Sequence, residues 1–214
     1  MLRMIALCLL LFTTAVHPAT PSYTTRAQAL SGTASSDPDE RAEALTWIAG
    51  HGTDADAPLL KNYLTDNDAN VRSAAEQGLW LLWSRSGDDA IDALLAHGVG
   101  QMSAGDLDGA IATFSEVIKR KPDFAEGWNK RATALFLAGE FRRSLADCDE
   151  VMKRNPLHFG ALAGYGQIYF QLEQYERAIE YWKRALEVNP NMSGVELGIR
   201  ATERLLEERR KRGA

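Results

Sequence analysis

The stretch Ile118-Lys119-Arg120-Lys121-Pro122 decides the fold, because its pattern returns twice at a fixed distance. The later copies are Met152-Lys153-Arg154-Asn155-Pro156 and Leu186-Glu187-Val188-Asn189-Pro190, and successive prolines lie 34 residues apart. Each proline follows an amphipathic segment and closes it, because proline cannot continue a helix. The period therefore predicts three copies of one helical unit.

Other positions repeat in phase with the prolines. Small residues recur at Ala110, Ser144 and Ala178 and at Gly98, Ala132 and Gly166; bulkier residues recur at Phe114, Cys148 and Trp182 and at Leu94, Trp128 and Leu162. The halves of each unit are joined by Gly105-Asp106, Gly139-Glu140 or Glu173-Gln174, which indicates a tight turn. Small residues let two helices approach, and large residues fill the space between hairpins. One hairpin cannot bury its apolar stripe alone, so the three must stack.

This pattern resembles the tetratricopeptide repeat (TPR) family. The resemblance covers residues 91–190 and divides into repeats 91–124, 125–158 and 159–192. It implies an all-α fold, a right-handed α-solenoid of helical hairpins. Residues 193–214 are expected to form a capping helix with a basic tail that solvates the open end of the array.

A second, shorter pattern lies upstream, in residues 37–88. An Asp-rich turn, an arginine and an Ala-rich helix occur around Arg41 and again around Arg72. This resembles HEAT-type repeats. The run Leu79–Trp83 is apolar on all sides, so its helix must be covered on both faces. We expect these helices to continue into the TPR array as one solenoid.

The N-terminus has the three parts of a secretory signal peptide. A short positive start precedes the apolar run Met4–Phe12, and small residues follow it. That run is about half the length of roughly 20 residues needed to cross a bilayer. We therefore expect a signal peptide over 1–19, a flexible leader over 20–36, and a periplasmic or secreted protein that contacts a membrane only before cleavage.

Composition excludes several classes of protein. The chain has 214 residues, with 24 basic and 29 acidic side chains and a net charge of −5. No basic surface for nucleic acid is predicted. Two cysteines exclude a disulfide scaffold and a Cys-rich zinc site, and signal removal leaves Cys148 as the only thiol.

Candidate sites for chemistry are weak. Asp66-x-Asp68-x-Asn70 copies the start of a calcium loop, but Val71 and Gln77 stand where that loop needs glycine and glutamate. A helix cap is the better interpretation. The histidines lie apart, and His97 is expected in the core. We predict no catalytic residues, no metal site and no cofactor.

The TPR resemblance implies that the first helix of each hairpin lines a concave groove. The candidate partner-binding residues are Val99, Met102, Glu126, Asn129, Lys130, Thr133, Phe136, Gln167, Phe170 and Gln171. Chaperone-binding members clamp a peptide carboxylate with Lys, Asn and Arg, but the corresponding positions here are Leu95, Val99, Gly160 and Gly164. The clamp is therefore absent. The leader or the HEAT-like helices are an alternative cover for part of this surface.

These observations favour a non-catalytic scaffold or adaptor that binds a protein or peptide partner, in the cell envelope. The alternatives are an accessory subunit of an enzyme and a self-associating scaffold, and the oligomeric state stays open. Asn129 and Lys130 are expected to project into the groove without a packing role. Trp128 is expected to pack between hairpins.

Overall fold

The computed structural model describes residues 23–213, and the regular structure in this range is helical. This confirms the all-α fold class. The N-terminal bundle consists of α1 (Arg26–Gly32), α2 (Pro38–His51), η1 (Asp54–Asp56), α3 (Ala57–Asn62), η2 (Tyr63–Thr65) and α4 (Ala69–Trp83). The expected signal peptide, residues 1–19, lies outside the described residues.

Part of the segment expected to be a flexible leader is a helix, which corrects that expectation. α1 begins with a capping box in which the Thr25 and Gln28 side chains satisfy each other's backbone amides. Ala29 is buried, and the Tyr23 hydroxyl donates to the Glu40 carbonyl oxygen at 3.2 Å. α1 therefore packs on α2 instead of remaining free.

Three hairpins follow, as the 34-residue period predicts. They pair α5 (Asp89–Ser103) with α6 (Leu107–Arg120), α7 (Ala125–Leu137) with α8 (Phe141–Arg154), and α9 (Phe159–Gln171) with α10 (Tyr175–Val188). The turns have positive φ at Gly105, Gly139 and Glu173, of which Glu173 alone has a side chain that opposes this conformation.

The small and large positions that repeat in the sequence meet inside the hairpins. A Cβ atom added at Gly166 would clash with the Trp182 indole, and one added at Gly98 would clash with the Phe114 ring. Trp128 differs from the expectation: it lies half-buried between the guanidinium groups of Arg131 and Arg154, at 5.1 and 4.7 Å. It therefore packs on the surface and not in the core.

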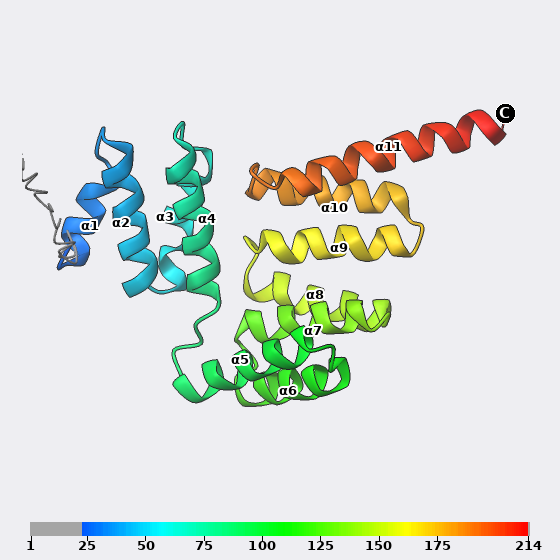
Figure 1. The fold of residues 1–214 in the computed structure, drawn as a ribbon, viewed down its shortest axis with the longest axis horizontal. Coiled ribbons are helices and arrows are strands. Elements are labelled where there is room, and N and C mark those ends of the chain that lie inside the picture. Colours follow the sequence, from blue (N-terminus) through cyan, green and yellow to red (C-terminus); the bar gives the residue numbers. More distant parts are fainter. Residues whose placement is uncertain (1–22, 214) are drawn as a thin grey trace, which may run out of the picture.

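The N-terminal bundle does not stack on the first hairpin as the next turn of one continuous solenoid, which was the expectation. α4 does not pack on α5, its neighbour in sequence; it runs across the start of α9 and the end of α10 (Figure 1). Phe159 is fully buried in the core of the N-terminal bundle. Asn191, in the turn after α10, donates its amide to the Leu64 carbonyl oxygen at 2.8 Å. The two parts share one core.

The array ends in α11 (Ser193–Gly213), whose first half packs on α10 and whose second half extends beyond it (Figure 1). Ile199 and Thr202 are buried, while Leu197 is exposed. Among the described helices, none combines the length and the apolar character that a membrane crossing requires.

Candidate partner-binding groove

α5, α7 and α9 lie in sequence along one face of the array, and we refer to the face that they line as the groove. A pocket of about 50 Å³ opens between α7 and α9. Its lining residues are Asn129, Ala132, Thr133, Phe136, Ser144, Cys148, Gly160, Ala161, Gly164, Gln167 and Ile168. The structure thus brings together Asn129, Thr133, Phe136 and Gln167, four of the predicted residues.

The pocket has a floor of small groups and a polar margin. Ser144, on α8, has no free donor, because its hydroxyl donates to the Ala132 carbonyl oxygen at 2.7 Å. The Thr133 hydroxyl likewise donates to the Asn129 carbonyl oxygen at 3.0 Å. Gln167 is exposed at the rim. The pocket therefore offers space and neutral hydrogen-bonding groups rather than charge.

The other predicted residues lie away from this pocket. Val99 and Met102 are half-buried beside the core of the first hairpin. Phe170 packs on Tyr175 and Trp182, with ring centroids 5.4 and 5.9 Å away. Gln171 is exposed at the end of α9.

The positions of Asn129 and Lys130 correct the expectation that both project into the groove without a packing role, and the groove candidate Glu126 is buried beside them. Glu126 is 1% exposed and Asn129 is 8% exposed. The Asn129 amide donates to Glu126 Oε2 at 3.0 Å, and Lys130 Nζ lies 2.9 Å from Glu126 Oε1 as an ion pair. Exchanging Asn129 and Lys130 for alanine would therefore weaken the neutralisation of a buried carboxylate, so the change would not be neutral for stability.

His158 completes this buried cluster. Its Nδ1 accepts the Ala161 backbone N–H at 3.1 Å, which caps α9, and its Nε2 lies 3.0 Å from Glu126 Oε2. Because Nδ1 is an acceptor, the ring is the neutral tautomer that donates from Nε2. Burial raises the pKa of the Glu126 carboxyl, but the His158 hydrogen bond and the Lys130 charge outweigh this, and the pKa lies below its usual range.

α4 covers the end of the groove where this cluster lies. The Trp83 ring stacks on His158 with centroids 4.7 Å apart, and the Trp80 ring meets Phe159 edge-on at 5.0 Å. A Cβ atom added at Gly160 would clash with the Trp80 indole. α4 therefore covers the groove directly at Gly160, and at Glu126 it does so through the His158 ring on which Trp83 stacks.

Sequence reasoning missed Trp80, Trp83 and His158 as contact residues. The all-round apolar run in α4 predicted a cover on both faces, and α2 and α9 provide it. Nothing in the 34-residue period indicated that α9 would be the partner. The core histidine is His158, and His97, expected in the core, is exposed.

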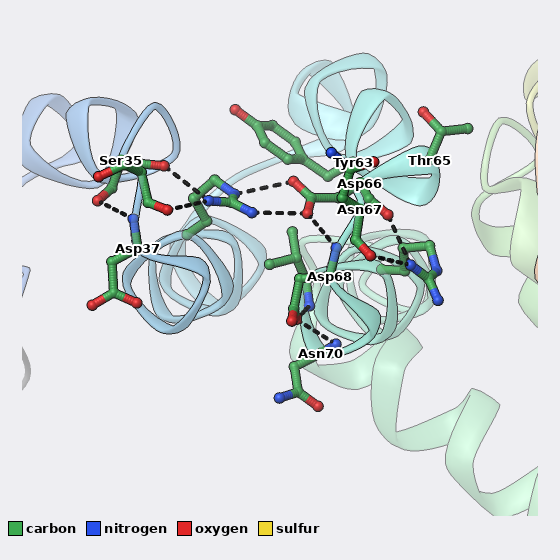
Figure 2. A network of polar contacts seen from close by, with 12 residues as sticks. Ser35, Asp37, Tyr63, Thr65, Asp66, Asn67, Asp68 and Asn70 are labelled. Atoms are coloured by element: carbon green, nitrogen blue, oxygen red, sulfur yellow. Dashed lines mark hydrogen bonds and ion pairs between the residues drawn. The ribbon is translucent and has the colours of Figure 1, made fainter.

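The Asp-rich loop before α4 takes part in a network of polar contacts within the bundle, which Figure 2 shows. The Arg41 guanidinium donates to both Asp66 carboxylate oxygens at 2.8 and 3.0 Å, and Asp68 caps the Asn70 and Val71 amides. These contacts use the groups that a calcium ion would need. No group of three or more potential metal ligands occurs within residues 23–213.

The two arginines of the upstream pattern make equivalent contacts 31 residues apart. Arg41 Nη1 donates to the Ser35 and Ser36 carbonyl oxygens, and Arg72 Nη1 donates to those of Asp66 and Asn67. The motif therefore repeats in space as well as in sequence. The likeness to HEAT repeats stays a prediction.

Two parts of the chain match family models described as tetratricopeptide repeats, residues 95–151 and 162–192. A TPR repeat-containing protein from Rhizobium etli is 30% identical over 132 residues, which are 62% of this chain and 65% of that protein. The chain thus spans just under two thirds of the length of this relative. These findings show that the chain contains TPR repeats.

Solved structures agree on the fold. The first TPR domain of Spaghetti, bound to the HSP90 peptide SRMEEVD, is 24% identical with a TM-score of 0.53, covering 55% of this chain and 93% of that one. The Sgt2 TPR domain from Aspergillus fumigatus is 21% identical with a TM-score of 0.55, covering 58% and 83%. The TPR solenoid expected from the period is confirmed.

Proposed function

We propose that this protein is a non-catalytic adaptor that binds a segment of a partner protein in the groove between α7 and α9. The observation that carries the proposal is the pocket, which opens between the first helices of consecutive TPR hairpins. The similar Spaghetti domain holds a peptide, which supports a TPR array as a peptide-binding surface. Helices and extended peptides are both recognised in such grooves.

The chemistry of the cavity residues supports a binding role and gives no support to catalysis. Cys148 is the most nucleophilic residue type at the pocket, but burial, with Asp147 and Asp149, raises the pKa of its thiol to about 12. A thiol of that pKa is protonated at neutral pH and a poor nucleophile. The Glu126–His158 pair is buried and caps α9, so it is not open to a substrate.

The test of the binding role is a pull-down with matched charged variants. Thr133 and Gln167 are exposed in the groove, and Ala112 and Ala146 are exposed on the second helices α6 and α8. Thr133→Arg with Gln167→Arg should abolish partner capture from cell extract. Ala112→Arg with Ala146→Arg adds the same charge elsewhere and should leave capture intact. Loss in the second variant, or none in the first, would refute the groove as the binding site.

We also propose that the protein acts in the cell envelope after export, on the basis of the N-terminal apolar run. Cell fractionation followed by N-terminal sequencing tests this. The recovered chain should begin between Val16 and Thr20 and be found outside the cytoplasm. A chain that keeps Met1 in the cytoplasm would contradict export.

A further inference from the structure

The groove also defines the chemistry of its ligand. We infer that the bound segment is uncharged and inserts one small apolar side chain, of valine size or less, into the pocket between α7 and α9. This inference rests on the proposed function and specifies its partner. The pocket volume of about 50 Å³ is larger than the space that one water occupies. It is well below the roughly 150 Å³ of a cavity that holds benzene, so only a small side chain fits.

Gly164 lines this pocket, and no neighbouring atom of the chain requires a glycine at this position. A Cβ atom added there would meet only Cys148 Sγ, at an ordinary contact distance of 3.8 Å. At Gly160 and Gly166, by contrast, an indole ring occupies the position. Glycine inside a helix costs about 1 kcal/mol relative to alanine. Packing does not explain Gly164, whereas close approach of a ligand does.

The residues that line the pocket are uncharged. On α7, Glu126 is neutralised by Lys130 and accepts a hydrogen bond from His158, so its charge is already matched inside the chain. A charged ligand group placed here would lose water without gaining a counterion.

The margin of the pocket suits a neutral backbone. Gln167 is exposed and makes no hydrogen bond with any other described residue through its side chain. Its amide both donates and accepts, so it can pair with a peptide group of the bound segment. An acidic C-terminal tail would find neither a clamp nor a pocket of the right chemistry, since Leu95, Val99, Gly160 and Gly164 stand at the clamp positions.

The experiment uses two probes on the whole chain. The first is the labelled peptide SRMEEVD, which should show no binding up to about 1 mM. The second is a random dodecapeptide library displayed on phage and selected on the immobilised protein. Selected peptides should share one Ala, Ser or Val position within a neutral stretch, and their synthetic forms should bind in solution.

Glycine variants then locate the selected peptides. Gly164→Leu fills the pocket and should weaken binding by at least about tenfold. Gly164→Ala adds one methyl group within an ordinary contact, so it keeps the fold and should give a smaller loss. Gly194→Leu is the matched control, because Gly194 on α11 has no neighbouring atom within 4 Å of an added Cβ.

The outcomes separate the two proposals. Binding of SRMEEVD, enrichment of acidic or bulky sequences, or undiminished binding to Gly164→Leu would overturn the inference. If peptides that contradict the inference nevertheless fail to bind the variant Thr133→Arg with Gln167→Arg, the groove remains the binding site. Peptides that ignore every groove variant, or a selection that enriches nothing, would overturn the proposed function itself.

Discussion

Replacing His158 by alanine should destabilise the protein by about 4 kcal/mol, because the ring has three roles at once. It caps α9, which is worth about 1 kcal/mol. It donates to the buried Glu126 carboxylate, a bond to a charged group worth about 1.5–3 kcal/mol. Its stacking on Trp83 adds about 0.5–1.5 kcal/mol. The expected fall in melting temperature is about 8–16 °C.

Urea denaturation followed by circular dichroism measures this loss. His97→Ala is the matched control, because His97 is exposed, and it should change stability by less than about 0.5 kcal/mol. In the background of Glu126→Leu the carboxylate is gone, so His158→Ala should cost about 1.5–3 kcal/mol less. A loss below about 1 kcal/mol in the single variant, or no coupling between the two sites, would refute the assignment of His158 as a structural hydrogen-bond donor.

Three further outcomes follow from the geometry. Glu173→Gly should raise stability by about 0.5–1 kcal/mol in thermal melts, since Glu173 has φ of 57° where the other turns have glycine, and a lower stability would contradict this. In a chain with Cys8→Ser, Cys148 should react with a disulfide reagent only after unfolding, because its thiol is buried and has a pKa near 12; fast labelling of the native protein would contradict this. The hydrogen bond from Arg41 holds the pKa of Asp66 below its usual range despite burial, so folding is stabilised above about pH 4 and this contribution is lost on acidification. Asp66→Asn should therefore reduce the fall of the urea unfolding midpoint as the pH is lowered through about pH 4. An unchanged pH dependence of the midpoint would show that Asp66 does not contribute to it.

The hairpins could be predicted from the sequence, because each one forms by contacts between two helices that are adjacent in the chain. Gly166 and Trp182 lie on paired helices of one repeat, so their sizes are matched at a fixed spacing and can be read from the period. The helix over Arg26–Gly32 was not predicted, because this segment has no apolar period. The one signal that could have indicated it is the capping-box spacing of Thr25 and Gln28.

The burial of Glu126 could not be read in the same way. Its environment depends on α4, which packs across α9 although some 75 residues separate Trp83 from His158 in the chain. The repeat register assigns Glu126, Asn129 and Lys130 to the groove. It gives no information on whether a helix from outside the repeats, here α4, packs against that end of the groove. By contrast, Thr133 and Gln167 lie farther along α7 and α9 from that cover. The register placed both in the groove, and the structure places both at the pocket.

The contact between α4 and the third hairpin changes how the array should unfold. In a simple solenoid each repeat touches only its neighbours, so the ends fray first and repeats unfold one by one. Here Asn191 is tied to Leu64 across 127 residues of sequence, and Phe159 belongs to the core of the bundle. Loss of the third hairpin therefore exposes the bundle core as well, and hydrogen exchange should show both protected to the same degree. Such a closure slows folding, because distant segments must meet before the contact forms. In return, it makes a modular chain behave as a single cooperative unit.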